Sequence, residues 1–379
     1  MPTNSQHFIS EIKSFDELGF DELEQWSVMA EANHKSAPFI GKNWLKPWIE
    51  NFAPETKFFL LKENNELKGI IPFILTSETF AGRKIKTAVS TTNQQSPHYD
   101  FLALENNQEH FLALWNAFLS EENFDIVMLH RLSEDSLTIS SAIETAKMQR
   151  LNMVLIECYR SPFRKLPTKE QGWETDLKPK FKSNLRNRMK RLSQIGQVSF
   201  EITDSREQLF AGMESFYQLE ASGWKKDAGG AILLDKKTKK FYDEFISNSS
   251  AQMSLAFLRV DGKDIASHLL YFHNQRLFLV KIAYDPQYSK YSPGQLLTAK
   301  VMEDVVSKGF EVFDFLGIEM TWKRDWTTDN YQNYILVVCK NNFNGKFAYW
   351  TRYGMKETLK KSKSLVKFVR AIKKKMNKE

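Results

Sequence analysis

The hydrophobic residues of this chain form short runs typical of strands, and the same succession of runs occurs twice. Lys57 to Phe80 contains an apolar run, a polar turn at Asn64-Asn65 and a second apolar run. Ser254 to Tyr284 repeats this pattern around a turn at Asp261-Gly262 and adds a third run. Apolar runs joined by such turns are typical of antiparallel hairpins. The matching spacing predicts an internal structural repeat.

Helical periodicity surrounds both hairpins. Further strands are predicted at FDIVMLHRL, EVFDFLG and NYILVVCK. Helices are predicted at residues 20–32, 105–120, 135–150, 206–222, 237–249 and 293–307, where apolar residues recur every three or four positions. Strands and helices that alternate after a meander indicate an α/β fold (α+β mixed), in which each half is a mixed, mostly antiparallel sheet flanked by helices.

A chain of 379 residues is expected to form two domains. The stretch RSPFRKLPTKEQGWETDLKP, rich in proline and turn residues, is the predicted boundary. The predicted division is residues 1–165 for the N-terminal domain, 166–197 for a linker and bridging helix, 198–345 for the C-terminal domain and 346–379 for a C-terminal helix.

The bridging helix is the segment FKSNLRNRMKRL. Its apolar residues Phe181, Leu185, Met189 and Leu192 lie on one helical face, and basic residues occupy the others. No Asp or Glu occurs between Lys178 and Phe200. A solvated basic face above a buried stripe and a site for an anion are both compatible with this pattern. The helix lacks the interleaved aromatic residues that stack on nucleic-acid bases.

The net charge of +7 is concentrated at the C-terminus. Ten Lys and Arg face two Glu between Lys356 and Glu379, so the rest of the chain is nearly neutral. Apolar residues at helical spacing there, Leu365 to Met376, predict a basic amphipathic helix. Such a helix either lies on an anionic membrane surface or packs on the protein with a lysine-rich end.

Targeting and cysteine patterns favour a cytoplasmic protein. The first thirty residues lack a basic segment followed by an apolar run, and no run approaches the length that a membrane-spanning helix needs. Cys158 and Cys339 each lie in an apolar run, which predicts reduced thiols in the core.

The segment from Leu277 to Gly317 has the strongest chemical signal. A strand ends near Tyr284, a polar loop follows, and Pro293 stands where a first-turn helix proline belongs. The unpaired N–H groups at such a helix start form a natural site for phosphate or pyrophosphate.

With its surroundings, this segment resembles the GNAT superfamily of acyl-CoA N-acyltransferases. The resemblance is closer to the BioF2-like or CelD-like acetyltransferase branch, which is related to the Fem-type aminoacyl transferases. It spans roughly Trp173 to Trp326, and the first half matches less specifically as a degenerate partner. The matching segments are FKSNLRNRMKRLSQIGQVSFEI, LFLVKIAYDPQY, YSPGQLLTAKVMEDVVSKG and FDFLGIEMTWKRDW. The resemblance implies two tandem GNAT-like domains joined by the basic helix.

The resemblance also implies a donor site for acetyl-CoA or a longer acyl-CoA, without a metal. The usual pyrophosphate loop has Gln or Arg and Gly at positions that Ser289 and Ser292 occupy here. The expected donor-binding residues are Ile282 and Ala283 for the acyl carbonyl and pantetheine, and Tyr291, Ser292, Gly294 and Gln295 for the pyrophosphate.

Acyl transfer to an amine also needs a base, an acid for the leaving thiolate and a group that holds the acceptor. His268 is a candidate base because free histidine titrates near neutral pH, and Asp314 is another at the end of its strand. Tyr288 or Tyr291 is a candidate acid. By resemblance to the Fem-type site, Lys323 is expected to help bind the acceptor. His98 and Asp100 of SPHYDF are expected near a cleft between the halves.

We therefore expect an N-acyltransferase that acts on an amine, with an amino sugar of a cell-surface polysaccharide as one candidate acceptor. A lipid-linked or polysaccharide acceptor would make membrane contact through the C-terminal helix useful, at the inner face of the membrane. Two alternatives stay open. One is a Fem-like transferase that uses aminoacyl-tRNA as donor, and the other is a noncatalytic GNAT-fold binding protein.

Overall fold

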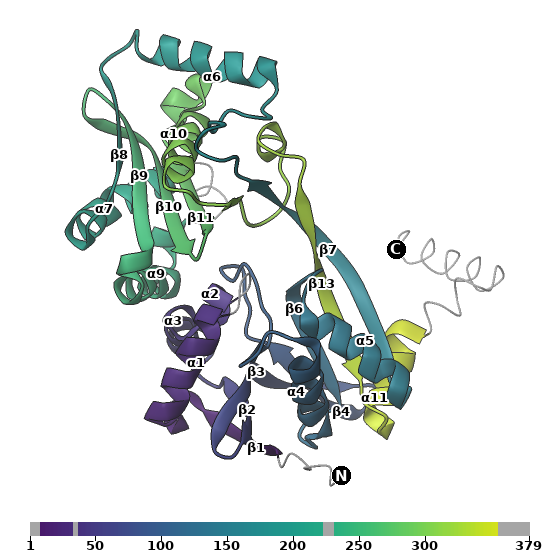
Figure 1. Ribbon diagram of the computed structural model, residues 1–379. Coiled ribbons are helices and arrows are strands. Elements are labelled where there is room, and N and C mark those ends of the chain that lie inside the picture. The colour runs from purple at the N-terminus through teal and green to yellow at the C-terminus, as the bar shows by residue number, and fades with distance from the viewer. Residues whose placement is uncertain (1–7, 33–36, 223–230, 355–379) are drawn as a thin grey trace, which may run out of the picture.

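Two bodies joined by long strands make up the fold (Figure 1). The computed structural model describes residues 8–32, 37–222 and 231–354. The elements of the first half are β1 (Phe8–Ser14), η1 (Phe15–Glu17), α1 (Phe20–Ala32), α2 (Ala37–Ile40), α3 (Lys42–Phe52), β2 (Lys57–Glu63), β3 (Glu66–Phe80), β4 (Arg83–Ser90), β5 (Leu102–Ala103), α4 (Gln108–Ser120), β6 (Ile126–Ser133), α5 (Leu137–Gln149) and β7 (Asn152–Lys165).

The second half continues from the bridging helix, α6, to the end of the described chain. Its elements are α6 (Pro179–Leu192), β8 (Val198–Ile202), α7 (Arg206–Ser222), η2 (Ile232–Leu234), α9 (Lys236–Asn248), η3 (Ser250–Gln252), β9 (Met253–Val260), β10 (Lys263–His273), β11 (Arg276–Tyr284), η4 (Pro286–Tyr291), α10 (Pro293–Ser307), β12 (Val312–Asp314), η5 (Lys323–Asp325), β13 (Asn330–Cys339), α11 (Phe343–Tyr349) and η6 (Trp350–Gly354).

The strands form one mixed sheet in the order β1-β2-β3-β4-β6-β13-β7-β12-β11-β10-β9-β8, and β5 pairs with β3. The predicted repeat is visible in this order. An antiparallel meander, β2-β3-β4 or β9-β10-β11, leads through a helix, α4 or α10, to a parallel strand, β6 or β12. The mixed α/β fold with two similar halves, each flanked by helices, is therefore confirmed.

Strands β7 and β13 join the two halves. β13 lies between β6 and β7 in the first half of the sheet, although it follows the second half in the chain. The end of β7, Phe163 to Lys165, pairs with β12 of the second half. Both strands run from one body to the other in Figure 1. The predicted C-terminal domain, 198–345, thus includes a strand that completes the sheet of the first half.

An aromatic cluster also holds the halves together. Helix α3 packs against α9, and the ring of Trp44 lies edge-on to Phe241 and Phe245, with centroids 5.0 and 4.6 Å away. Phe39 contacts Phe278 of β11 in the same way at 5.0 Å. Because these side chains are buried in one continuous core, the two halves keep a fixed relation.

The basic bridging helix α6 forms as its pattern predicts. Pro179 stands in its first turn, and Phe181, Leu185 and Leu192 are buried in the core of the second half. The ring of Phe181 meets Trp326 edge-on at 4.9 Å. Helix α6 packs on α10 and lies across it in Figure 1, and its basic side chains Lys180, Lys190 and Arg191 are exposed.

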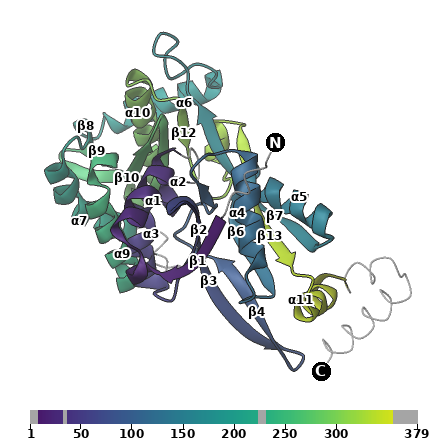
Figure 2. The same cartoon turned by 60° about the horizontal axis from the view of Figure 1, so that its bottom comes forward.

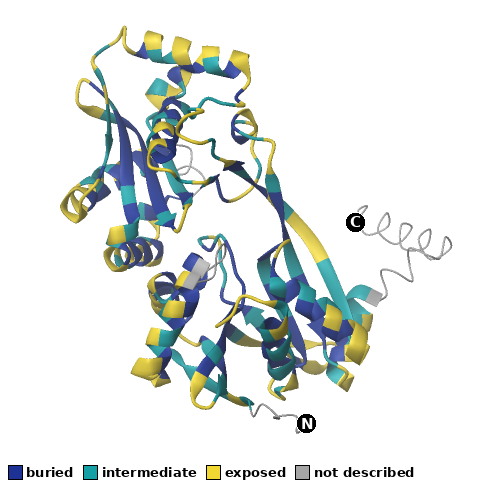
Figure 3. Ribbon diagram, viewed as in Figure 1, coloured by how far each residue is buried: buried dark blue, intermediate teal, exposed yellow. Residues whose placement is uncertain are grey.

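Two local predictions differ from the structure, and a third concerns residues that the structure does not describe. The first half has a third meander strand, β4, whose sequence RKIKTAVS was too polar for the pattern to indicate; Figure 2 shows the hairpin of β3 and β4 extending from the body. Cys158 is exposed whereas Cys339 is buried. Cys158 lies in the middle of β7, where the strand runs between the bodies and is largely exposed (Figure 3). The predicted basic C-terminal helix lies beyond residue 354, outside the described residues.

Candidate active site

The candidate site begins where two parallel strands separate. β11 pairs with β12 from Arg276–Val312 to Phe278–Asp314, and the pairing then ends. β11 continues to Tyr284, paired on its other side with β10. Among the described residues no strand therefore covers this edge of β11 from Leu279 onward. Residues of this part of β11 line two cavities.

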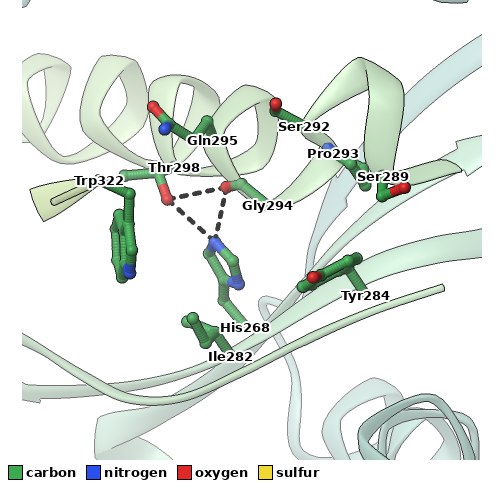
Figure 4. Close-up of a pocket in the computed structure, with 10 residues that line it drawn as sticks. All are labelled: His268, Ile282, Tyr284, Ser289, Ser292, Pro293, Gly294, Gln295, Thr298 and Trp322. Atoms are coloured by element: carbon green, nitrogen blue, oxygen red, sulfur yellow. Dashed lines mark hydrogen bonds between the residues drawn. The ribbon is translucent and has the colours of Figure 1, made fainter. Parts of the chain in front are cut away.

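The first cavity, of about 210 Å³, lies at the start of α10 (Figure 4). Ser292 has a left-handed backbone (φ 51°) and turns the chain from η4 into α10. The N–H groups of a helix start attract anions. The lining residues are His268, Ile282, Tyr284, Ser289, Ser292, Pro293, Gly294, Gln295, Thr298 and Trp322.

His268 forms the floor of this cavity. It is buried, and Nε2 lies 3.1 Å from the carbonyl oxygen of Gly294 and 3.0 Å from Oγ1 of Thr298. Nδ1 lies 2.9 Å from the carbonyl oxygen of Ser267. The hydroxyl of Thr298 donates to Gly294 as well. These bonds fix the first turn of α10 on β10, as the dashed lines in Figure 4 show.

Two features of the cavity fit a phosphate-bearing donor with amide groups. Gly294 stands open: a Cβ there would meet only Cε1 of His268, at 3.9 Å. The side-chain oxygen of Gln295 is buried without a hydrogen-bond partner among the described residues. Buried acceptors are normally satisfied, so such an oxygen marks a place for a ligand N–H or a water molecule. The predicted donor residues Ile282, Ser292, Gly294 and Gln295 all line this cavity.

The second cavity, of about 630 Å³, lies between the two halves and adjoins the first. Ile282, Tyr284 and Trp322 line both, and the predicted donor residue Ala283 lines the second. The lining residues are Gln94, Leu219, Glu220, Leu279, Val280, Lys281, Ile282, Ala283, Tyr284, Phe315, Leu316, Gly317, Ile318, Met320, Trp322 and Lys323. Gln94 comes from the first half and Glu220 is the only carboxylate in this set.

Lys323 lies in the wall of the second cavity, and its side chain is almost fully buried. Its Nζ donates to the carbonyl oxygens of Leu316, at 2.5 Å, and Ile318, at 2.9 Å. Burial lowers the pKa of Lys323 to about 8, although the charge of Asp314 acts in the opposite direction. A lysine in this state titrates close to physiological pH and keeps a donor for a ligand.

Asp314 lies behind this wall rather than in it. The carboxylate is fully buried and pairs with Arg276 at 2.9 Å. It also accepts hydrogen bonds from the N–H of Leu316, at 2.9 Å, and the hydroxyl of Tyr331, at 3.2 Å. The structure therefore gives Asp314 the contacts of a structural acid that orders the end of β12.

Four other candidates, His98, Asp100, Tyr288 and Tyr291, line neither cavity. Asp100 accepts from Thr138 at 2.5 Å, from Ser136 at 2.9 Å and from the N–H of Phe101 at 2.9 Å, all within the first half. Burial raises the pKa of Asp100 to about 6.

The two loop tyrosines pack against basic side chains. The Tyr291 ring is buried beneath the guanidinium of Arg191 on α6, 5.6 Å from its centroid. The ammonium of Lys263 lies 5.3 Å from the Tyr288 ring centroid. Neither tyrosine lines the first or the second cavity.

Several residues that line these cavities are not predicted from the sequence, among them Gln94, Glu220, Tyr284 and Trp322. Ile282 and Tyr284 are two positions apart on β11, so strand alternation could have indicated that Tyr284 shares the face of a predicted donor residue. Glu220 had no such signal, because α7 reaches the cavity only through tertiary packing. Among the residues described, no group of His, Cys, Asp and Glu side chains could hold a metal ion.

Comparisons with known proteins support the fold and the GNAT-type domain. Residues 179–324 match the family described as an acetyltransferase (GNAT) domain. No curated protein matches the sequence. The chain is similar to the solved structure of FemX, with a TM-score of 0.57 and 11% identity over 90% of this chain and 99% of that one.

Two further structures share the fold. The first is the C-terminal domain of a putative lysylphosphatidylglycerol synthetase from Agrobacterium fabrum, with a TM-score of 0.54 and 13% identity over 89% of this chain and 96% of that one. The second is a protein of unknown function from Bacteroides thetaiotaomicron, with a TM-score of 0.56 and 10% identity over 88% of this chain and 100% of that one. At the level of the GNAT domain the resemblance is confirmed; the BioF2-like or CelD-like branch stays a prediction.

Proposed function

We propose that this protein is an N-acyltransferase that moves an acyl group from a coenzyme A thioester to an amine. The observation that supports this most directly is the meeting of two cavities along the open edge of β11. One lies at a helix start suited to a pyrophosphate, and the other lies between the halves and holds a lysine and a carboxylate. Ile282, Tyr284 and Trp322 line both, so a donor and an acceptor would meet beside this strand.

In the proposed complex the donor lies along β11. Its pyrophosphate faces Ser292 and Gly294 at the start of α10, and its pantetheine amide satisfies the buried oxygen of Gln295. Backbone N–H groups near Ile282 and Ala283 polarise the thioester carbonyl, because an N–H aimed at a developing oxyanion stabilises it.

The acceptor amine is proposed to enter the cavity between the halves. Its nitrogen attacks the thioester carbon, a C–N bond forms, the C–S bond breaks and the thiolate takes up a proton. Glu220 is the carboxylate in this cavity and the proposed proton acceptor. Asp314 and His268 are not proposed for this role, because Asp314 pairs with Arg276 and His268 is hydrogen-bonded to α10. Tyr284, which lines both cavities, is the proposed proton donor, and Lys323 holds the acceptor.

An amino sugar of a cell-surface polysaccharide is the proposed acceptor class, because the cavity between the halves offers polar and charged groups at Gln94, Glu220, Lys281 and Lys323. An acyl-CoA donor would place the reaction in the cytoplasm. The basic sequence after residue 355 would bring the protein to the inner face of a membrane if the acceptor is lipid-linked. No helix within the described ranges has the length and apolarity to cross a bilayer.

Calorimetric titration with acetyl-CoA and longer acyl-CoAs, at two salt concentrations, tests the donor site. Saturable binding is expected in the wild type and is lost in Gly294→Trp, whose side chain would fill the cavity. Gly294→Ala is the matched control, because its Cβ makes only an ordinary contact with His268 at 3.9 Å. Absence of binding to every acyl-CoA would overturn the proposal.

A second candidate, transfer from an aminoacyl-tRNA, is favoured by the position of α6. Lys180, Lys190 and Arg191 are exposed on this helix, which packs on α10 and η4 beside the donor cavity. Phosphate contacts make nucleic-acid binding strongly salt-dependent. A filter-binding assay with charged tRNA would support this donor if binding is saturable and is weakened by Lys180→Glu and Lys190→Glu together, with acyl-CoA binding absent.

A further inference from the structure

The first half contains its own opening between parallel strands. β4 pairs with β6 from Thr87–Ile126 to Val89–Met128, and there the pairing ends. This is the counterpart of the point where β11 and β12 separate. In the second half, the start of α10 faces the opening. The corresponding helix of the first half is α4, which begins only at Gln108 and has its N-terminus capped by Asn107. The first-half opening therefore has a different chemistry.

A cavity of about 550 Å³ occupies this opening. Gln94 lines both it and the cavity between the halves, so the two adjoin. The lining residues are Val89, Ser90, Thr92, Asn93, Gln94, His130, Arg131, Cys158, Tyr159 and Ile335, and none of these is acidic. The polar members are hydroxyl, amide, imidazole and guanidinium groups, most of which donate hydrogen bonds.

Arg131 is the charged group of this cavity. Its backbone is left-handed (φ 63°), a conformation that L-residues rarely adopt. Its Nη1 donates to the hydroxyl of Tyr159 at 3.0 Å. Within the described ranges no carboxylate lies within ion-pair distance of this guanidinium. A guanidinium presents five donors, so this one keeps several for a ligand.

The rim of the cavity is held in shape by hydrogen bonds. The N–H of His130 donates to Oγ of Ser90 at 2.9 Å, and Oγ1 of Thr92 lies 3.1 Å from the same oxygen. These bonds fix the end of β6 to the loop after β4. Arg131 therefore faces the cavity from a defined backbone.

We propose that the first-half cavity is an oxyanion subsite for the acceptor, in which Arg131 binds a phosphate or carboxylate group while the reacting amine lies in the adjoining cavity beside Lys323. Guanidinium groups bind both anions through paired hydrogen bonds, and the surrounding hydroxyl and amide groups supply further donors. This deepens the proposed function, because it names the acceptor as an amine that also carries an anionic group.

The test is a titration of the Gly294→Trp variant, whose donor cavity is filled, with inorganic pyrophosphate and separately with malonate. Saturable binding of either anion is expected, and their relative affinity distinguishes a phosphate from a carboxylate ligand. Introducing Arg131→Asn into the Gly294→Trp protein should weaken anion binding roughly 10- to 100-fold, because a charged hydrogen-bond donor is lost. Asparagine tolerates the left-handed backbone.

Arg150→Asn is the matched control. Arg150 is also left-handed (φ 53°), but it is exposed at the end of α5 and lines none of these cavities. This variant should bind the anions as the parent does. Arg131→Lys keeps the charge and should weaken anion binding less than Arg131→Asn does. If Arg131→Asn does not fold, the anion affinity of Arg131→Lys is compared with that of the Arg150→Asn control instead.

The subsite is overturned if neither anion saturates the Gly294→Trp protein, or if the Arg131 and Arg150 variants bind alike. The outcome is independent of the donor proposal, which is tested on the wild type with acyl-CoA.

Discussion

The hydroxyl of Tyr331, on β13, lies 2.9 Å from Nε2 of His98, although 233 residues separate the two in sequence. The same hydroxyl donates to Asp314, which pairs with Arg276 of β11. One phenol thus connects a loop of the first half to the strand that borders the candidate site.

Replacing Tyr331 with Phe should destabilise the whole protein. The change removes both hydrogen bonds and leaves buried polar groups poorly satisfied, which costs about 1–3 kcal/mol of unfolding free energy. Chemical denaturation followed by fluorescence measures this loss. The control is Tyr334→Phe on the same strand, whose hydroxyl makes no hydrogen bond within the described part of the chain. Equal stability of the two variants would contradict a connecting role.

Lys323 should make acceptor binding depend on pH. Since burial lowers its pKa to about 8, the ammonium that holds the acceptor loses its proton as pH rises through that value. The acceptor KM should be constant below pH 7 and increase above pH 8, with a pKa of about 8. Arg stays protonated throughout this range, so Lys323→Arg should lack the transition. A wild-type profile that is flat from pH 7 to 9 would exclude this role.

Glu220→Gln should lower kcat with little effect on stability. Glu220 accepts the N–H of Ile232 at 2.9 Å, and the glutamine side-chain oxygen can accept the same bond. Loss of a general base typically costs roughly 10²- to 10⁴-fold in rate. Glu214→Gln, at an exposed position of the same helix, is the control. If kcat of Glu220→Gln equals that of the control, another group accepts the proton.

Asp100 should make the first half less stable as pH rises from 4 to 6. Its folded pKa of about 6 lies above the ordinary value of 3.8, so the folded state holds a proton that the unfolded state releases. The resulting stability is complete below pH 4 and is lost as pH rises through 6, a change of roughly 2–3 kcal/mol. Asp100→Asn removes this titration. Unfolding curves of wild type and variant measured at pH 4, 5, 6 and 7 should diverge; parallel curves would be the contrary result.

Local sequence patterns predicted the elements well. The helical periodicity predicted α7 and α10 at their observed bounds, Arg206–Ser222 and Pro293–Ser307. The turns at Asn64-Asn65 and Asp261-Gly262 have the left-handed backbones that such residues favour. Each of these features depends on neighbours within a few residues, and a single sequence records such neighbours directly.

Long-range pairing and side-chain direction could not be predicted in the same way. The run NYILVVCK indicates a strand, but nothing in it selects β6 and β7 of the first half as partners. The resemblance to the GNAT loop implies that Tyr291 contacts the donor pyrophosphate. In the structure η4 turns its ring toward α6, and Arg191 covers it. The side chains that line the cavities depend on such rotations.

The place of β13 between β6 and β7 has a consequence for biosynthesis. Until residues 330–339 have left the ribosome, β6 and β7 present unpaired backbone edges, which are prone to pairing with other chains. The residues that separate β7 from β13 take roughly 10–30 s to translate at 5–20 residues per second. The sheet of the nascent first half therefore stays incomplete during that time, and a chaperone that shields strand edges would be useful until β13 has been added.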